Sequence, residues 1–194
     1  TRMARVRERE LHASLAALGV TEHHLLGLTD GTCAAAPHHV IVEHLADIVD
    51  VVAPDTIVTF GPDGMTGHED HQAVSAWATD AHTLAAPEAR LLYATTTEEF
   101  AQAWEPSREA FDVFLADGLP LRTPSRDLAV ELRLDADAVD RKIVALRAQA
   151  SQTTGLFAAL GEDRVREWWS TETFVEAHTA RARAQAWGTW RVAA

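Results

Sequence analysis

The chain has 194 residues, enough for one sizeable core, and its 47% hydrophobic and 24% charged residues are typical of a globular protein. Its formal net charge is −12 and Lys142 is its only lysine, so nucleic acid and anionic membrane, which need a basic surface, are not expected as partners. Cys33 stands alone, which excludes a disulfide framework and favours a reducing, cytoplasmic setting. No apolar run is long enough to predict a membrane span.

The first half of the chain predicts helices on either side of one short strand. In chain order the pattern predicts a helix over 1–18 closed by Gly19, a short strand over 25–28 with a turn at 29–31, a helix over 40–52, a buried strand over 56–60, and a helix from about 68 to 84. A strand between two helices is typical of a parallel sheet with crossover connections.

The second half predicts more of the same sheet and then a mostly helical end. We expect a strand over 90–95, a helix over 97–115 broken at Pro106, a half-exposed strand over 127–134, a helix over 135–149 capped by Asp135, and a helical, aromatic-rich remainder with Trp168, Trp169, Trp187 and Trp190. There is no repeat, low-complexity tract or linker in the sequence, so we expect a single domain over 1–194.

A glycine-rich loop joins the central strand to the helix that follows it. The loop, residues 61–67, carries Pro62, Asp63 and three glycines, and the sequence His68-Glu69-Asp70-His71 follows directly. His68 and His71 are three residues apart in the first helical turn and therefore lie on one face. Open α/β sheets build their sites beyond the ends of their strands in this way.

Histidine and carboxylate groups crowded at such a junction suit a divalent metal. A catalytic zinc typically has three protein ligands and a water, whose pKa it lowers, and it polarises a carbonyl for amide or ester hydrolysis. One histidine would bind the metal, the other would stabilise the oxyanion or protonate the leaving amine, and Asp70 would orient a histidine. The alternative from spacing alone is an exposed histidine that caps the helix.

These residues carry a resemblance. Gly61-Pro62-Asp63-Gly64, followed by Gly67-His68-Glu69-Asp70-His71, resembles the second signature of the PIG-L (LmbE-like) deacetylases, with Glu69 where the family usually has Pro. Residues 7–31 are similar to the family's helix and following strand, and 142–152 resemble its C-terminal segment, with Gln149 in place of a His. The family implies a Rossmann-like, three-layer α/β sandwich with a mostly parallel sheet, of which this chain would lack the N-terminal strand.

The resemblance also implies roles for single residues. His71 matches the metal-binding histidine, His68 the residue that stabilises the transition state or acts as acid, and Asp70 the residue that supports them. Arg7 and Asp30 match positions that line the sugar site, and Asp63 is a further candidate for substrate contact. The implied cofactor is zinc, with iron as the alternative. The implied reaction removes an acetyl group from an N-acetylglucosaminyl conjugate, and a homo-oligomer is left open.

The family's first signature, His-Pro-Asp-Asp-Glu, is absent from the 194 residues. It would supply the other metal ligands and the general base, and one histidine cannot hold a catalytic zinc. We therefore expect the chain to be an N-terminally incomplete part of a deacetylase domain. The alternative is a non-catalytic homologue that has lost the metal and acts as a sugar-binding or partner subunit. A third reading is an amidase that acts on another acyl group.

Several other residues allow both a structural and a functional interpretation. Asp30-Gly31 forms either a plain turn or a substrate contact, and Arg7 pairs with Glu10 on the helix surface or touches sugar. Asp63 shapes the turn or contacts substrate. The remaining signals, for which we favour surface exposure or core packing over a binding role, are His23-His24, His38-His39 and Trp168-Trp169.

Overall fold

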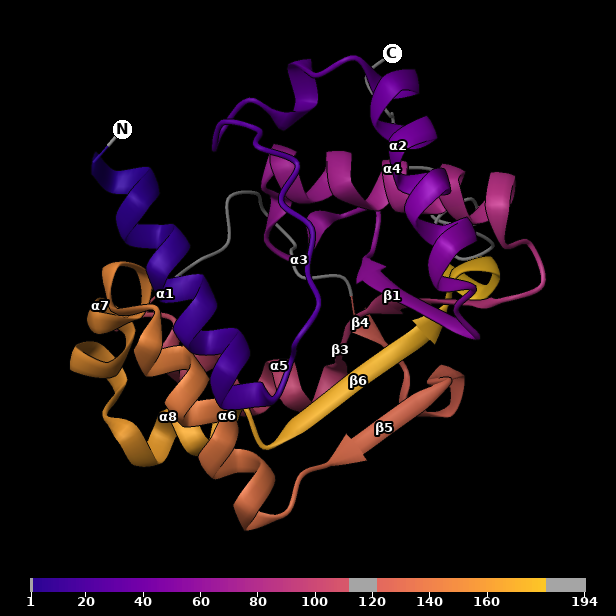
Figure 1. Cartoon of the computed structure of the whole chain (residues 1–194). Coiled ribbons are helices and arrows are strands. Elements are labelled where there is room, and N and C mark those ends of the chain that lie inside the picture. Colours follow the sequence, from indigo (N-terminus) through magenta and orange to yellow (C-terminus); the bar gives the residue numbers. More distant parts are fainter. Residues whose placement is uncertain (1, 112–121, 181–194) are drawn as a thin grey trace. The chain divides into compact units, whose positions relative to one another are not determined.

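The structure is a computed structural model that describes residues 2–111 and 122–180 (Figure 1). Its helices and strands follow in chain order: α1 (Arg2–Leu18), η1 (Cys33–Ala35), α2 (His38–Val52), β1 (Thr56–Phe60), α3 (Gly64–Gly67), α4 (Glu69–Ala85), β2 (Arg90–Ala94), β3 (Thr96–Thr97), α5 (Glu98–Trp104), η2 (Glu105–Ser107), β4 (Arg122–Thr123), η3 (Ser125–Asp127), β5 (Val130–Arg133), α6 (Ala136–Ala148), α7 (Ala150–Leu160), α8 (Glu162–Trp168) and β6 (Thr171–Glu176). None of the helices in the described residues is long and apolar enough to cross a membrane.

The chain forms two compact units, which we describe separately. Unit 1 comprises Thr1–Gly27, Ala103–Asp112 and Leu132–Glu172, and unit 2 comprises Leu28–Gln102, Val113–Glu131 and Thr173–Ala194. The single domain over residues 1–194 stays a prediction.

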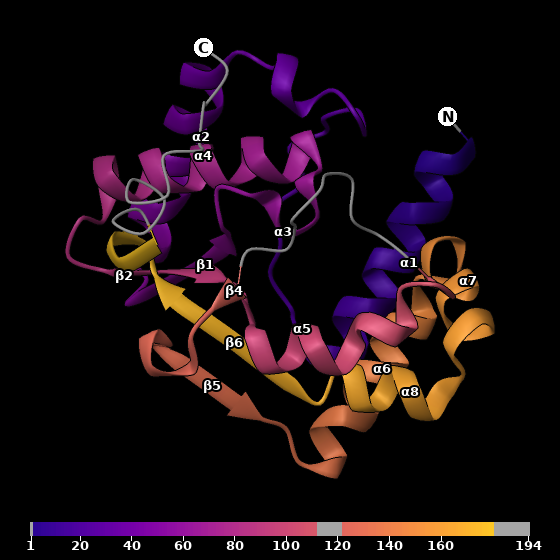
Figure 2. The same cartoon turned by 180° about the vertical axis from the view of Figure 1, so that it is seen from behind.

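Unit 2 contains a mixed β-sheet in the order β1-β2-β6-β5 (Figure 2). β1 and β2 are parallel and in register from the pair Thr56–Arg90 to the pair Phe60–Ala94, as the flanking helices predicted. β6 runs antiparallel to β2, with Val175 opposite Tyr93. The predicted α/β, Rossmann-like fold class is therefore confirmed, with an antiparallel strand added to its parallel pair.

The packing of two helices of unit 2, α4 and α2, fixes the position of the first turn of α4 beside the sheet. α4 packs against β1, and the hydroxyl groups of Thr79 and Tyr93, 2.7 Å apart, join α4 to β2 through a buried hydrogen bond. α2 packs on α4 through an apolar core of Val42, Ala46, Trp77 and Ala81. Because α4 is held on both sides, its first turn has a defined position beyond the carboxyl end of β1.

Unit 1 is helical. α1 packs on α6, and the buried core of the unit consists of Val139, Ile143, Leu156 and Val165. Trp168 and Trp169 pack against this core, and the Trp168 ring stacks on that of Trp104 with centroids 5.2 Å apart. The packing interpretation of the tryptophan pair is thus the one that the structure supports. Trp187 and Trp190 lie outside the described residues.

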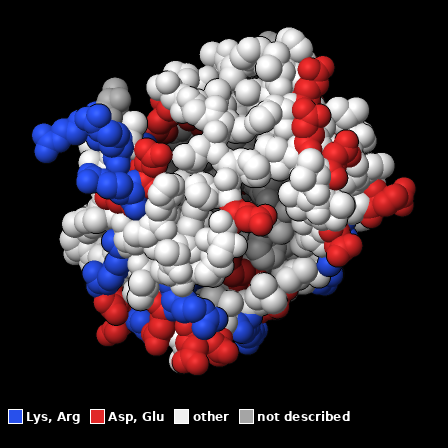
Figure 3. All heavy atoms as spheres, viewed as in Figure 1, with Lys and Arg blue, Asp and Glu red and all other residues white. Residues whose placement is uncertain are grey.

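Charge is unevenly distributed over the helices of the two units. Basic side chains gather at the N-terminal end of α1, whereas acidic side chains line the face covered by α2 (Figure 3). On α2 the exposed acidic residues are Glu43, Asp47 and Asp50. Both patterns agree with helices that turn their polar faces to solvent.

Six predicted elements are correct to within two or three residues. They are the first helix (α1), the second helix (α2), the central strand (β1), the helix after the His68–His71 motif (α4), the strand over 90–95 (β2) and the helix over 135–149 (α6). Asp135 caps α6 as predicted, since its Oδ1 accepts the Ala138 N–H at 2.8 Å.

Other expectations were wrong. Residues 25–28 are not a strand, because Gly27 has a φ of +70° and residues 25, 27 and 28 are exposed without a partner strand. The predicted edge strand over 127–134 is shorter (β5), and the mostly helical remainder contains β6. β1 is not buried, because it is an edge strand of the described sheet and the Val58 side chain is 55% exposed.

The helix predicted over 97–115 corresponds to α5 (Glu98–Trp104), which passes into the 3-10 turn η2 at Pro106. The predicted break at this proline is confirmed, but the prediction of helix beyond it is wrong for residues 108–111, which are not helical. Positions 112–115 of that predicted helix lie outside the described residues.

Candidate active site

The loop between β1 and α4 is tightly folded around two glycines. A Cβ at Gly61 would lie 2.8 Å from Oδ1 of Asp63, so the Asp63 side chain would have to shift to admit any other residue. Gly64 has a φ of +65°, and a Cβ at this position would lie 3.0 Å from the Cβ of His71. Met65, a non-glycine residue, also has a positive φ of 65°. Strain of this kind is typical of functional loops.

His68 is the N-cap of α4, and its ring accepts a backbone hydrogen bond. The Nδ1 atom of His68 lies 3.1 Å from the backbone nitrogen of Asp70. Because the backbone N–H is a donor, Nδ1 must be the unprotonated nitrogen. The neutral ring therefore carries its proton on Nε2.

His71 has the opposite arrangement. Its Nδ1 lies 2.9 Å from the carbonyl oxygen of Gly64, so Nδ1 carries the proton and donates it. The lone pair of this ring is then on Nε2. The ring stacks on Phe60 with centroids 4.2 Å apart, and the His68 and His71 centroids are 5.0 Å apart. Two adjacent imidazoles thus offer one Nε2–H donor and one Nε2 lone pair.

Asp70 follows in the first turn of α4 and is 8% exposed. Its carboxylate accepts the N–H of Gly31 at 2.6 Å and the N–H of Cys33 at 2.9 Å. Burial raises the pKa of this carboxyl. The two N–H donors and the nearby His68 lower the pKa by more than burial raises it, so the pKa lies below the ordinary value. The same carboxylate and burial raise the pKa of the Cys33 thiol, burial being the larger cause.

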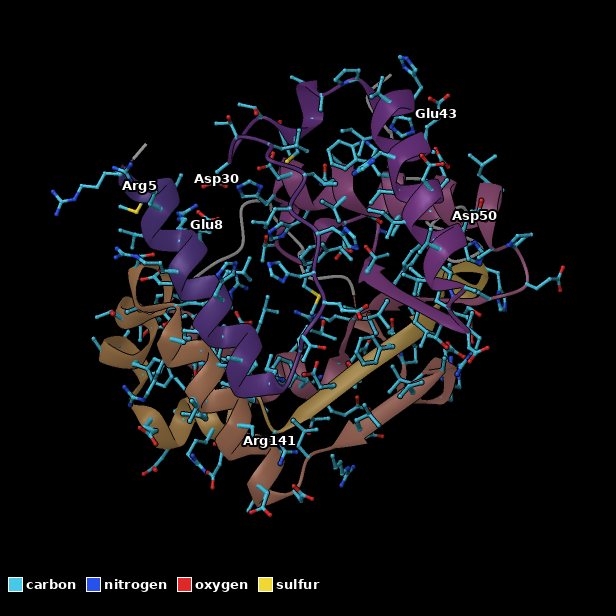
Figure 4. All side chains as sticks on the ribbon, viewed as in Figure 1. Arg5, Glu8, Asp30, Glu43, Asp50 and Arg141 are labelled. Carbon is cyan, nitrogen blue, oxygen red and sulfur yellow. The ribbon has the colours of Figure 1, made fainter. Side chains whose placement is uncertain are left out.

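The other candidate residues lie in different surroundings. Asp63 is buried in the loop, and its carbonyl oxygen accepts the Gly67 N–H at 3.1 Å. Asp30 lies on the irregular, exposed segment before α2 (Figure 4), next to the Gly31 N–H that Asp70 binds. The structure therefore brings His68, Asp70, His71 and Asp63 together in unit 2. Arg7 is exposed on α1, in unit 1.

The described residues do not form a complete metal site. In residues 2–111 and 122–180 no three His, Cys, Asp or Glu side chains are grouped so that they could hold a metal ion. The free Nε2 of His71, fixed by the bond of Nδ1 to a carbonyl, has the form of one histidine ligand. By themselves these residues do not fit a catalytic zinc, which needs three ligands.

The remaining histidine pairs take part in surface contacts. His38, at the start of α2, lies 2.8 Å from the exposed carboxylate of Asp80, and the rings of His12 and His23 meet edge to face at 5.0 Å. The Glu10 carboxylate accepts hydrogen bonds from the N–H and hydroxyl of Ser151, and the charge of Arg7 also lowers its pKa. Gln149 donates to the Ser14 hydroxyl at 3.3 Å within the same unit.

The comparison with known families matches the part of the chain that carries the site. Residues 1–82 match the family described as PIG-L: GlcNAc-PI de-N-acetylase. The resemblance to the PIG-L family is confirmed. All six candidate residues named from the sequence lie within the matched segment.

Several curated relatives carry one name, 1D-myo-inositol 2-acetamido-2-deoxy-alpha-D-glucopyranoside deacetylase. The protein of that name from Acidothermus cellulolyticus is 30% identical over 86% of this chain and 65% of its own length. One from a Mycobacterium species is 32% identical over 74% of this chain and 53% of its own length. One from a Nocardioides species is 28% identical over 89% of this chain and 72% of its own length. The chain thus spans between about half and three quarters of these PIG-L relatives.

Sequence reasoning did not find three groups that shape this site. They are the Phe60 ring under His71, the Gly64 carbonyl on its Nδ1, and the backbone of residues 31–33 on Asp70. An aromatic residue in the last strand position before the loop is the one sequence signal for the first of them. The backbone groups have no sequence signal, because every residue carries them.

Proposed function

We propose that this chain supplies the His68–His71 part of the active site of a metal-dependent N-deacetylase. The observation that carries the proposal is the opposite protonation of the two neighbouring rings, with an Nε2–H on His68 and an Nε2 lone pair on His71. The match of residues 1–82 to the PIG-L family and the names of the curated relatives support it.

His68 is proposed to stabilise the oxyanion that forms when the acetamide carbonyl is attacked. The Asp70 N–H donates to its Nδ1, so the proton of the neutral ring is on Nε2. A neutral ring donates a hydrogen bond from Nε2 and keeps its proton. This geometry supports oxyanion stabilisation over proton donation to the leaving amine.

His71 is proposed as one ligand of zinc or iron through Nε2. When bound, such a metal activates water and polarises the carbonyl. The remaining ligands and the general base are proposed to come from the family's His-Pro-Asp-Asp-Glu signature, which the 194 residues do not contain. The Gly64 carbonyl and the Phe60 ring hold the imidazole in one orientation for this purpose.

The proposed substrate is a small N-acetylglucosaminyl conjugate, and the products are acetate and the free amine. The relatives' names support an acetamido sugar linked to inositol. Asp30, Asp63 and Arg7 are the proposed sugar contacts. The site of action is proposed to be the cytoplasm.

The rival proposal is a non-catalytic homologue. It is favoured by the absence of a three-ligand group from residues 2–111 and 122–180.

Metal analysis of the purified protein, together with acetate release from N-acetylglucosaminyl-inositol, separates the enzyme from the non-catalytic homologue. About one zinc or iron per chain and acetate release, abolished in His71→Ala but kept in His39→Ala, support the enzyme. His39 is an exposed histidine and serves as the matched control. Protein without metal and without acetate release supports the rival.

A further inference from the structure

The carboxylate of Asp70 connects two segments that are far apart in the sequence. One oxygen accepts the Gly31 N–H at 2.6 Å and the other accepts the Cys33 N–H at 2.9 Å. Both bonds are made to a carboxylate that is 8% exposed. Hydrogen bonds to a charged, shielded acceptor are stronger than those between neutral groups.

The segment that Asp70 holds is a turn without helix or strand over residues 28–32. Within it the N–H and the hydroxyl of Thr32 both donate to the Thr29 carbonyl, and Gly31 adopts a φ of +80°. After the turn, Cys33 packs partly against the core between α2 and α4. The two bonds to Asp70 therefore join the turn to the first turn of α4.

Asp70 contacts His68 as well. Its backbone N–H donates to Nδ1 of His68, while its carboxylate binds the peptide between Asp30 and Gly31. One residue thus relates the position of the exposed Asp30 carboxylate to that of the proposed oxyanion donor. The bond to the Gly31 N–H restrains the peptide that follows Asp30.

We propose that Asp70 is a positioning residue that clamps the 29–33 turn onto α4 and thereby sets the affinity for substrate through Asp30. The clamp itself stands on the hydrogen bonds alone. Its effect on substrate affinity rests on the proposed function. Loss of the clamp is therefore expected to weaken binding rather than the chemical step.

The single cysteine reports on the clamp without any enzyme assay. Cys33 is partly buried beside Asp70, so 5,5′-dithiobis(2-nitrobenzoate) reacts with its thiol when the turn opens. In Asp70→Asn one carboxylate oxygen becomes an NH2 group that faces an N–H donor. Because the Asp70 carboxylate also raises the pKa of the thiol, the two proteins are compared at a pH that fully ionises the thiol in both, and there we expect labelling to be about tenfold faster in Asp70→Asn. Glu69→Gln, a change at an exposed acidic residue in the first turn of the same helix, is the matched control and is expected to label like the wild type.

Equal labelling rates in Asp70→Asn and the wild type would overturn the clamp. Circular dichroism verifies that the variant is folded. If it is not, amide hydrogen exchange on the unmodified protein decides: protection of the Gly31 and Cys33 amides about tenfold above free-peptide rates supports the clamp. Exchange of both amides at free-peptide rates contradicts it.

Kinetics on the full protein test the second half of the proposal. With N-acetylglucosaminyl-inositol as substrate, we expect Asp70→Asn and Asp30→Asn each to raise KM about tenfold with kcat within about threefold. The double variant should resemble Asp30→Asn, because both changes act through one contact. A fall in kcat at constant KM would overturn it and assign Asp70 to the chemical step. An inactive wild type would contradict the proposed function, while the labelling result still decides the clamp.

Discussion

The ring of Phe60 lies flat on the ring of His71, with an interplanar angle of 2° and 4.2 Å between centroids. Phe60 is the last residue of β1, and His71 is in the first turn of α4. The strand therefore ends with the side chain that sets the orientation of the proposed metal ligand. The carbonyl of Gly64 fixes the same ring by a hydrogen bond to Nδ1. Together they leave Nε2 as the atom available for a ligand.

Removing the aromatic face should loosen His71 and destabilise unit 2. We expect Phe60→Leu to lower the free energy of unfolding by about 1–2 kcal/mol, from lost stacking and packing. Urea denaturation measures this. Val58→Ala, at an exposed position of the same strand, should change stability by less than about 0.5 kcal/mol. Equal effects of the two changes would show that the stacking contributes nothing.

His68 is predicted to have two separable roles, as a helix cap and as a hydrogen-bond donor. An Asn side chain can also accept the Asp70 N–H, so His68→Asn should unfold within about 0.5 kcal/mol of the wild type. His68→Ala should lose about 1 kcal/mol because it lacks the cap. Both should lower kcat of the full enzyme about 100- to 1000-fold, since the oriented Nε2–H is gone. Activity of His68→Asn near that of the wild type would contradict the donor role.

Local pattern was enough to predict the elements that build the site. The β-branched run 56–60, the glycines after it and the His-x-x-His spacing depend on neighbours in sequence, and β1 and α4 formed as expected. β6 was missed because its partner is β2, about 80 residues away, and its own sequence, TETFVE, has too few apolar residues to stand out. Register with a distant strand is a tertiary property.

The contacts of the candidate residues also divide into those that the local sequence predicts and those that depend on the tertiary structure. The two histidines were found from their spacing, but the partner of each Nδ1 is a backbone group that no pattern specifies. Asp70 was expected to orient a histidine through its side chain. Its backbone N–H makes that contact, and its carboxylate binds the turn at Gly31 and Cys33.

Gly61 is predicted to have little space for a side chain. Gly61→Ala should destabilise the fold by about 1–3 kcal/mol, because its Cβ would lie 2.8 Å from the buried Asp63 carboxylate. Gly155→Ala is the matched control: it lies inside α7, its Cβ would meet only the Phe111 ring at 3.9 Å, and helix propensity predicts a gain of about 0.5–1 kcal/mol. Thermal and urea unfolding of both variants measure the two effects. A neutral Gly61→Ala would show that the loop can move away from the new methyl group.

Glu10 is predicted to make the stability of unit 1 depend on pH. Its carboxylate accepts the Ser151 hydroxyl at 2.5 Å and the Ser151 N–H at 2.9 Å, near the start of α7. These two bonds hold the pKa of Glu10 below its ordinary value of 4.5, and the bond from the hydroxyl has the larger effect. Since the folded-state pKa is lower than the unfolded one, this stabilisation is fully present above about pH 4.5 and is lost as the pH falls through the folded-state pKa.

Glu10→Gln should therefore unfold at lower urea concentration than the wild type at pH 7. The difference between the two should shrink as the pH falls below 4.5, because the wild-type carboxyl then becomes protonated as well. Glu8→Gln removes one charge from an exposed position of the same helix and controls for the change in net charge. A difference between Glu10→Gln and the wild type that stays constant down to pH 3 would mean that the carboxylate's charge does not stabilise this contact.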